Sequence, residues 1–314
     1  MNIGIDMMGG DFAPAEAVKG IRLFLSGSTS PAGLFLFGDE QQITPLLQQE
    51  GIPADKTTII PTTQVIEMHE HPTRALKEKQ QSSISVGFHY LSTGKIDAFI
   101  SAGNTGAMLV GTMYSIKAIE GVQRPTISTI IPKENGGTGL LLDVGLNADC
   151  KPENLNQFAV LGSLYAKHIL GIDDPKVGLL NIGEEEGKGN LLAQAAYPLL
   201  KANDQINFAG NIEGRDVFLD KADVMVCDGF TGNIILKLAE SLFEITQSKQ
   251  IDHPYFERFN FENYGGTPVL GVSKPVIIGH GISHAKAFHN MILVAQKMAE
   301  SRLMEMMKES FVQA

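Results

Sequence analysis

The sequence is poor in cysteine, with only Cys150 and Cys227 among 314 residues. The two lie far apart, and each adjoins an apolar segment that has the character of a strand. This placement indicates reduced, buried thiols and argues against a disulfide framework or a cysteine metal knuckle. Reduced thiols are typical of a cytoplasmic protein.

Basic residues are fewer than acidic ones. Lys and Arg number 25 against 35 Asp and Glu, so the formal net charge is -10. Because non-specific nucleic-acid binding depends on a basic surface, we expect no nucleic-acid partner. The content of 43% hydrophobic and 19% charged residues is ordinary for a globular protein with a large core.

Long uncharged apolar runs are also lacking, and none approaches the length of a membrane-spanning helix. The opening residues, Met1 to Asp6, are too short and wrongly charged for a signal peptide. They have instead the pattern of a first strand. We therefore expect a cytoplasmic location.

Short apolar strands alternate with amphipathic helices along almost the whole chain. This alternation predicts an α/β fold, a three-layer α/β/α arrangement around a mostly parallel sheet. No linker or repeat is visible, so we expect a single α/β domain over residues 1–314. An irregular, aromatic-rich excursion is expected at 248–266. Two helices are predicted from Asn233 to Gln247 and from His284 to Lys308.

Two segments far apart in the sequence have nearly the same pattern. Residues 97–106 and 222–233 each run from a short apolar strand through a Gly/Thr/Asn turn into a helix-like segment. A glycine turn that opens a helix exposes backbone N–H groups to an anion, and the helix N-terminus adds partial positive charge. The pattern predicts an enzyme that handles phosphate or an acyl oxyanion.

Polar, glycine-rich residues follow six of the predicted strands. Ligands bind at the carboxyl ends of strands in open parallel sheets, so these segments form the candidate site. One such segment alone could be an ordinary turn, but six together favour a functional site. They are Met8–Asp11, Gly103–Gly106, Gly145–Asp149, Asn181–Asn190, Asp228–Asn233 and Gly279–His284.

Lys188 lies between two glycines in one of these segments, which suits a cation that binds phosphate. A solvated loop lysine is the equally weighted alternative. The surrounding segment lacks the spacing of a P-loop, and Gly279–Gly281 lacks the third glycine of a dinucleotide fingerprint.

Metal and covalent chemistry have weaker signals. His69–His71 lacks helical spacing, and His280 and His284 span a turn and a helix start, so we predict no metal site. No serine lies in a Gly-x-Ser-x-Gly elbow, and no cysteine has a neighbouring histidine in the sequence. A covalent nucleophile is therefore unsupported.

Taken together, these motifs resemble those of the bacterial phosphate acyltransferase family of phospholipid synthesis, the PlsX-type acyl-acyl-carrier-protein:phosphate acyltransferases. They occur in order along the whole chain. The matching motifs are Asp6–Asp11, Ser101–Ala107, Leu141–Gly145, Lys151–Glu153, Gly178–Gly183, Lys188–Asn190, Asp228–Asn233, Asn263–Gly266 and His280–Gly281.

The resemblance implies transfer of a fatty acyl group from acyl carrier protein to inorganic phosphate, giving acyl phosphate. It implies a Rossmann-like fold akin to phosphotransacetylases and isopropylmalate dehydrogenases. It also implies a homodimer without a cofactor, loosely attached to the inner face of the membrane.

Phosphate can attack a thioester directly, because the thioester is already activated. The enzyme must dock the dianion and stabilise the oxyanion of the tetrahedral intermediate. Backbone N–H groups at Asn104–Gly106 and Thr231–Asn233 suit this task. Lys188 and Arg74 would supply positive charge. Asp228 would orient a hydrogen-bond donor; it is a poor candidate for the general base, because phosphate needs little deprotonation near neutral pH.

The candidate residues follow from these roles. The catalytic candidates are Asn104, Thr105, Lys188, Asp228 and Asn233. The substrate-binding candidates are Gly9, Gly10, Asp11, Arg74, Gly103, Gly106, Asn181, Gly229, Thr231, Gly232 and His280.

One segment departs from the family pattern. Family members usually have a longer helical hairpin before the Asn263–Gly266 motif, and membrane contact is usually placed there. Only Leu238–Glu262 fills that place here. We therefore expect weak peripheral membrane contact at most.

Other functions would fit parts of the sequence. A phosphotransacetylase-like enzyme would use coenzyme A in place of the carrier protein, and a dehydrogenase of related fold would need NAD(P). A non-catalytic anion-binding module would explain the glycine turns but not six converging polar strand ends.

Overall fold

The computed structural model describes residues 1–27 and 32–312, and the chain divides into two compact units. Unit 1 comprises Met1–Ala118 and Glu262–Met304. Unit 2 comprises Ile119–Phe261 and the C-terminal stretch that begins at Glu305. The single domain expected from the sequence stays a prediction.

Within the described residues, the strands of unit 1 are ordered β3-β2-β1-β4-β11-β10. Neighbouring strands are parallel except β10 and β11. The strands are apolar because helices cover the sheet, and all four residues of β4 are buried. The carboxyl ends of β1, β4 and β11 therefore lie at one edge. The strands are β1 (Asn2–Asp6), β2 (Gly33–Gly38), β3 (Thr57–Pro61), β4 (Ala98–Ser101), β10 (Thr267–Leu270) and β11 (Val276–Ile278).

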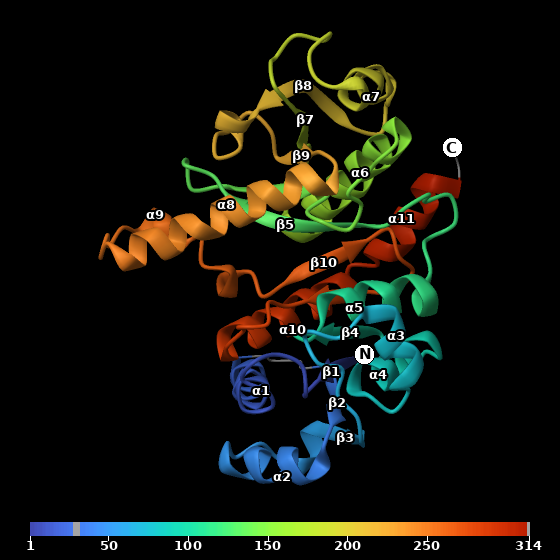
Figure 1. Ribbon diagram of the computed structural model, residues 1–314, viewed down its shortest axis with the longest axis vertical. Coiled ribbons are helices and arrows are strands. Elements are labelled where there is room, and N and C mark those ends of the chain that lie inside the picture. The colour runs from blue at the N-terminus through green and yellow to red at the C-terminus, as the bar shows by residue number, and fades with distance from the viewer. Residues whose placement is uncertain (28–31, 313–314) are drawn as a thin grey trace. The chain divides into compact units, whose positions relative to one another are not determined.

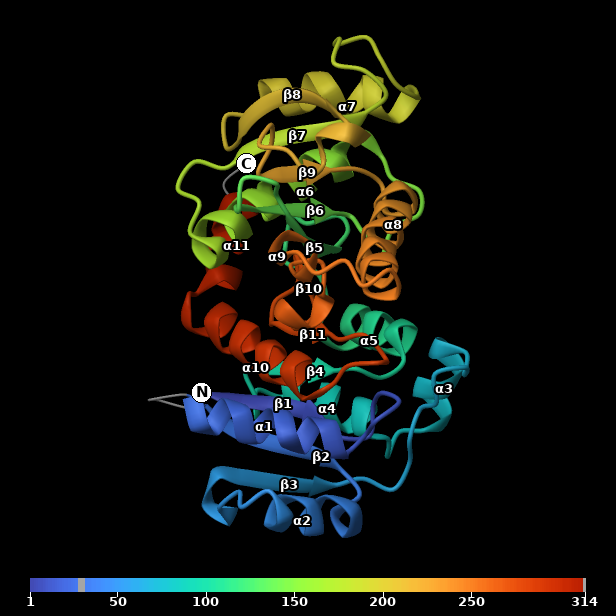
Figure 2. The same ribbon diagram turned by 90° about the vertical axis from the view of Figure 1, so that its left-hand side faces the viewer.

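Helices cover both faces of this sheet, which gives unit 1 the predicted three layers. Figures 1 and 2 show α1 beside α10, where a Cβ atom on Gly20 would lie 2.8 Å from the carbonyl oxygen of Ala285. Helix α4 packs on the opposite face against β1, β2 and β4. The helices are α1 (Ala15–Gly27), α2 (Glu40–Gln49), α3 (Pro72–Glu78), α4 (Ser83–Ser92), α5 (Thr105–Gly111) and α10 (Ala285–Glu300). A π-helix at Thr112–Ile116 continues α5.

The described strands of unit 2 are ordered β5-β6-β9-β7-β8. Only β5 and β6 are antiparallel, so β6, β9 and β7 end at the same edge. The strands are β5 (Thr126–Pro132), β6 (Thr138–Leu142), β7 (Lys176–Asn181), β8 (Asn207–Glu213) and β9 (Val224–Val226).

The helices of unit 2 include α6 and α7, which pack together against the sheet. Gly162 brings α6 close to β9, since a Cβ atom there would lie 2.6 Å from a methyl carbon of Val224. The helices are α6 (Pro152–Tyr165), with a π-helix at Ala166–Leu170, α7 (Leu191–Ala202), α8 (Gly229–Ser248) and α9 (Pro254–Glu257). Most of α11 (Leu303–Val312) also belongs to this unit.

Two helix predictions were wrong in their bounds. Helix α8 begins at Gly229, four residues before the expected start at Asn233, because Asp228 caps it. The single helix expected from His284 to Lys308 is two helices, α10 and α11. The break falls where Arg302 adopts a left-handed conformation with φ of 57°.

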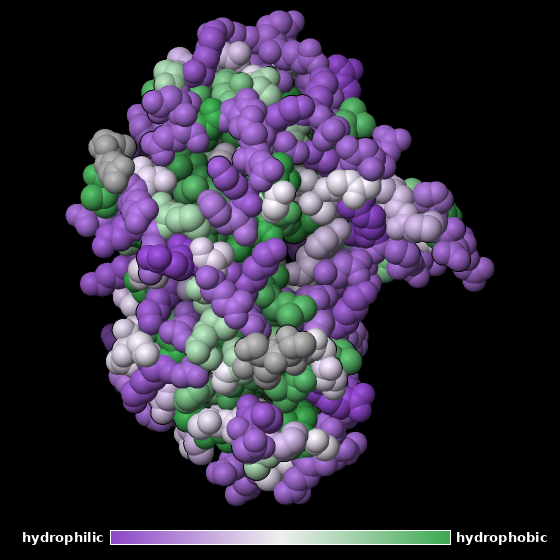
Figure 3. Space-filling model, turned by 180° about the vertical axis from the view of Figure 1, so that it is seen from behind, coloured by the Kyte–Doolittle hydropathy of each residue, from purple (hydrophilic) through white to green (hydrophobic). Residues whose placement is uncertain are grey.

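None of the helices in residues 1–27 and 32–312 combines the length and the apolar character needed to cross a membrane. Figure 3 shows hydrophilic residues over much of one face of the molecule, with hydrophobic residues distributed among them.

Candidate active site

At the carboxyl edge of unit 1, the buried side chains of Asp6 and Ser101 join two neighbouring strands. The Oγ atom of Ser101 donates to Oδ2 of Asp6 at 2.6 Å, and the N–H of Met8 donates to Oδ1 at 3.0 Å. Burial raises the pKa of Asp6 above its ordinary value, while these hydrogen bonds oppose the rise. The pair fixes the loop after β1 against the loop after β4.

Glycines allow these loops to touch backbone to backbone. A Cβ atom on Gly9 would lie 2.6 Å from the backbone nitrogen of Gly103. Gly10 has a positive φ of 100°, a conformation that favours glycine. The N–H of Asp11 donates to the carbonyl of Gly281 at 2.8 Å, which brings in the loop after β11. The loops of three strands therefore meet here.

Both atoms of the Asn104 side-chain amide make hydrogen bonds within the protein. Its Oδ1 accepts a 2.9 Å hydrogen bond from the N–H of Ala107 and so caps α5. Its Nδ2 donates to the carbonyls of Glu67 and Glu70 at 2.9 and 3.0 Å. The side chain of Asn104 therefore positions the start of α5, and both its amide oxygen and its amide nitrogen already have hydrogen-bond partners within the protein.

The backbone at the start of α5 differs, because the N–H groups of Asn104, Thr105 and Gly106 have no acceptor within residues 1–27 and 32–312. The N–H of Gly103 is occupied, since it donates to Oγ of Ser101 at 2.9 Å. Three consecutive free N–H donors at the start of a helix suit an anion.

Two other candidates of unit 1 lie outside this set of donors. Arg74 is exposed on α3, and its Nε pairs with Oε1 of Glu78 at 2.9 Å. His280 is exposed in the loop after β11, and its carbonyl accepts from Oγ of Ser283 at 2.6 Å. Arg74 is thus partly neutralised by its own helix, whereas His280 shares the strand-end edge.

Asp143 organises the corresponding edge of unit 2. Its carboxylate accepts hydrogen bonds from the N–H of Asn147 at 2.6 Å and from Nδ2 of the same residue at 2.8 Å. The carbonyl of Asn147 accepts from the N–H of Gly229 at 2.8 Å, which joins the loop after β6 to α8. Burial raises the pKa of Asp143, and the hydrogen bonds oppose the rise.

Asp228 is the N-cap of α8. Its two carboxylate oxygens accept from the N–H and the Oγ1 of Thr231, both at 2.9 Å. The N–H of Gly232 donates to the carbonyl of Asp228 at 3.0 Å. From the sequence we predicted that the N–H groups of Thr231–Asn233 bind an anion. This prediction was wrong for the N–H groups of Thr231 and Gly232. Both donors are used in the first turn, because the helix starts earlier than expected.

Asn233 and Gly229 occupy different places at this edge. Asn233 is exposed, and its Oδ1 lies beside Gly145, where a Cβ atom would be 3.4 Å away. Gly229 is buried, and a Cβ atom there would lie 2.7 Å from the carbonyl oxygen of Asn147. Gly229 therefore allows the close approach, and the exposed amide of Asn233 lies beside Gly145.

The loop after β7 is shaped by two asparagines. Nδ2 of Asn181 donates at 3.1 Å to the carbonyl of Lys188 and to Oδ1 of Asn211. Nδ2 of Asn211 donates to the carbonyl of Glu185 at 2.9 Å. The amide of Asn181 is therefore engaged within the loop and orients the backbone around Lys188.

Lys188 is exposed, and its Nζ has no carboxylate within ion-pair distance in the described part of the chain. The neighbouring acidic residues pair elsewhere, Glu186 with Lys201 at 2.9 Å and Glu184 with Lys221. The loop therefore presents a cation that its own glutamates leave free.

The structure gathers most of the sequence candidates at two strand edges. In unit 1 these are Gly9, Gly10, Asp11, Gly103, Asn104, Thr105, Gly106 and His280; in unit 2 they are Asn181, Lys188, Asp228, Gly229, Thr231, Gly232 and Asn233. Arg74 lies apart. The named site candidates did not include the organising side chains Asp6, Ser101, Asp143, Asn147 and Asn211. Of these, Asp6, Ser101 and Asp143 already stood in the matching motifs, and Asn147 stood in the strand-end segment Gly145–Asp149.

The fold is that of the phosphotransacetylases, as predicted. A phosphotransacetylase from Streptococcus pyogenes matches with a TM-score of 0.67 over 95% of this chain and 94% of that chain, at 18% identity. A family model described as fatty acid synthesis protein matches residues 1–253 and 248–306.

Closer relatives are found among curated sequences. Phosphate acyltransferase from Halothermothrix orenii is 42% identical over 98% of each chain. Phosphate acyltransferase from Desulfitobacterium hafniense is 44% identical over 98% of this chain and 97% of the relative. The chain belongs to the phosphate acyltransferase family, which confirms the resemblance seen in its motifs.

Proposed function

We propose that this protein transfers a fatty acyl group from acyl carrier protein to inorganic phosphate and so makes acyl phosphate for phospholipid synthesis. Membership of the phosphate acyltransferase family supports acyl transfer to phosphate. The family model described as fatty acid synthesis protein supports a fatty acyl substrate. The carrier protein and the phospholipid role come from the motif resemblance.

The observation that carries the proposal is the set of free N–H groups at Asn104–Gly106. Attack of phosphate on a thioester carbonyl develops negative charge on the carbonyl oxygen. Preorganised donors aimed at such an oxyanion are each worth about 10²–10³ in rate. Asp6, Ser101 and the side chain of Asn104 hold these donors in place before substrate arrives.

Lys188 is proposed to bind phosphate. A dianion needs a compensating charge, and a charge-assisted hydrogen bond from an ammonium is stronger than a neutral one. The glycines on either side let the backbone adapt around the anion, and Asn181 holds the carbonyl of Lys188. Arg74 is kept as a secondary candidate that would have to leave Glu78 to act.

Asp228 acts as a positioning residue in this proposal. Its carboxylate is engaged by Thr231, and phosphate needs little deprotonation near neutral pH, so no base is required. Asn233 presents a free amide at the same edge as a neutral donor. We further propose a cytoplasmic homodimer with weak peripheral contact at the inner membrane face.

An acyl-coenzyme A:phosphate transferase is the second candidate, favoured by the phosphotransacetylase fold. The two candidates differ in the donor. We expect kcat/KM for palmitoyl-acyl carrier protein to exceed that for palmitoyl-coenzyme A. Turnover with palmitoyl-coenzyme A but not with palmitoyl-acyl carrier protein would favour the acyl-coenzyme A:phosphate transferase instead.

A further inference from the structure

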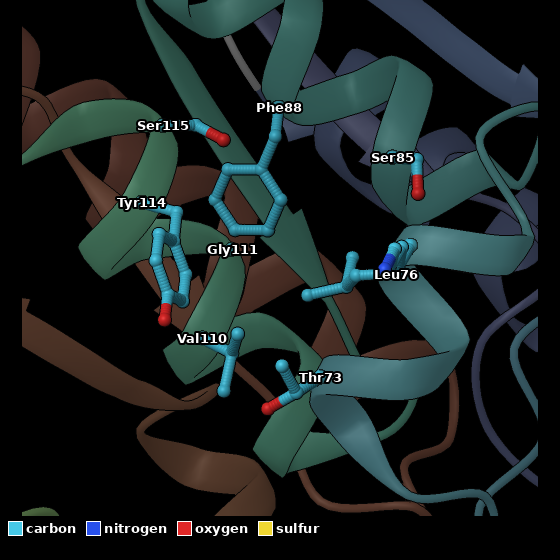
Figure 4. A pocket seen from close by; sticks show the side chains of 9 residues that line it. Thr73, Leu76, Ser85, Phe88, Val110, Gly111, Tyr114 and Ser115 are labelled. Carbon is cyan, nitrogen blue, oxygen red and sulfur yellow. The ribbon is translucent and has the colours of Figure 1, made fainter.

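A cavity of about 260 Å³ lies within unit 1 between α3, α4 and the end of α5. Figure 4 shows the side chains of Leu76, Phe88, Val110 and Tyr114 around it, with hydroxyl groups at its rim. A pocket for a whole small ligand typically measures ~300–1,000 Å³. This cavity is therefore suited to part of a longer molecule.

The floor of the cavity depends on a glycine. A Cβ atom on Gly111 would overlap the ring of Phe88, so only glycine lets this ring lie against the helix backbone. Directly after Gly111 the α-helix becomes a π-helix, which carries Tyr114 and Ser115 at the cavity. Single-turn π-helices are frequent at functional sites.

The rim of the cavity carries polar groups, the ammonium of Lys77 and the hydroxyls of Thr73, Ser85, Tyr114 and Ser115. The Oγ atom of Ser85 already donates to the carbonyl of Lys79 at 2.9 Å. The walls supplied by Leu76, Phe88 and Val110 are hydrocarbon. An apolar segment is the ligand chemistry that such walls favour.

The cavity lies along the same helix as the free N–H groups. A Cβ atom on Gly106 would overlap the ring of Pro72, so α3 and α5 begin side by side. Val110 is five residues beyond Thr105, a distance of about 8 Å along a helix. A long acyl chain can span this distance from a carbonyl held at Asn104–Gly106, whereas an acetyl group cannot.

We propose that this cavity holds the distal part of the donor's acyl chain and so makes the enzyme favour long chains over short ones. The inference rests on the proposed function, because it assumes that the acyl carbonyl reacts at the start of α5. It assigns to α3, α4 and the π-helix a role in substrate choice.

Filling the cavity tests this assignment. Figure 4 shows the hydroxyl of Ser115 pointing into the cavity, so Ser115→Phe places a ring there. We expect the ratio of kcat/KM for palmitoyl- over butyryl-acyl carrier protein to fall by about tenfold or more. Ser92→Phe, at the exposed end of α4, is the matched control and should keep the wild-type ratio. An unchanged ratio in Ser115→Phe would overturn the proposal.

A binding measurement separates this proposal from the proposed function. The chain has no tryptophan, so Tyr114→Trp introduces a single reporter at the cavity rim. Palmitate should shift its emission to the blue with saturation, while acetate should not. Met113→Trp, the exposed neighbour outside the cavity, is the control. No shift at position 114, or the same shift at both positions, would reject the cavity. Lack of acyl phosphate production by the wild type would instead reject the function.

Discussion

The backbone of Gly232 packs directly against the carbonyl oxygen of Asp143, so a Cβ atom on Gly232 would overlap that oxygen. This contact seats the first turn of α8 on the end of β6. It explains why a glycine stands inside a helix, where it normally weakens the structure.

Gly232→Ala should destabilise unit 2 and displace the start of α8. Overpacking against a fixed backbone atom typically costs roughly 1–3 kcal/mol. Urea unfolding measures the loss. Gly214→Ala is the control, since a Cβ atom there meets nothing within 4 Å. Equal stability of the two variants would contradict the contact.

Lys188→Ala should raise the phosphate concentration needed for half-maximal rate more than that of the acyl donor. Removing one charge-assisted contact should cost roughly 1.5–3 kcal/mol of phosphate binding. Steady-state kinetics with each substrate varied in turn gives both values. Lys56→Ala is the control, because Lys56 is an exposed lysine of unit 1 that pairs with its neighbour Asp55. Unchanged phosphate dependence would assign Lys188 to a solvated loop.

Asp6 should make stability fall as pH rises. Burial raises its pKa in the folded protein above the ordinary value of 3.8, so the folded state holds this proton more tightly. The stabilisation is complete below pH 3.8 and is lost as pH rises through the folded pKa. As pH rises from 3.8 through the folded pKa of Asp6, the free energy of unfolding of the wild type should therefore fall relative to that of Asp6→Asn. Each unit of pKa difference corresponds to about 1.4 kcal/mol.

Denaturant unfolding at a series of pH values checks this trend. Asp39→Asn is the control, because a hydrogen bond from Gln42 lowers the pKa of Asp39. The wild type should gain stability relative to that variant as pH rises. A rising trend for Asp6 as well would contradict the effect of burial.

Binding to anionic liposomes should be weak. Three aromatic rings of the excursion, those of Tyr255, Phe256 and Phe259, lie against one another, and Phe259 is buried with its ring 5.4 Å from that of Phe218. The segment contains two cations, Lys249 and Arg258, and three acidic residues, so its electrostatic attraction to anionic lipid is small. Strong co-sedimentation with phosphatidylserine vesicles that is lost in Phe256→Ser would contradict this prediction.

A stable dimer is expected in solution. The motif resemblance implies a homodimer, and the protein concentration at which it forms can be measured by sedimentation velocity. A monomer at micromolar concentration would contradict this expectation.

Much of the fold could be predicted because apolar periodicity determines which faces are buried. The alternation of strands and helices and the glycine turn at Gly103–Gly106 were correctly predicted from residue type alone. The start of α8 was not. Gly229 and Gly232 disfavour a helix locally, and the tertiary contacts with Asn147 and Asp143 that require them are invisible in the sequence.

Other features depend on tertiary packing. No glycine or proline marks the break at Arg302 between α10 and α11. The side-chain amides of Asn104 and Asn181 also have partners that the sequence does not reveal, because backbone carbonyls in other parts of the fold accept their hydrogen bonds. The cavity beside Phe88 arises only when three helices are assembled.

The central claim is transfer of an acyl group to phosphate, and trapping the product tests it most directly. Wild-type protein is mixed with palmitoyl-acyl carrier protein, with and without inorganic phosphate. The carrier protein is then removed by ultrafiltration, because hydroxylamine also cleaves its thioester, and hydroxylamine is added to convert acyl phosphate into palmitoyl hydroxamate. We expect thioester loss to require phosphate and to yield hydroxamate in equal amount. Thioester loss that is independent of phosphate, or that yields free palmitate alone, would contradict the account.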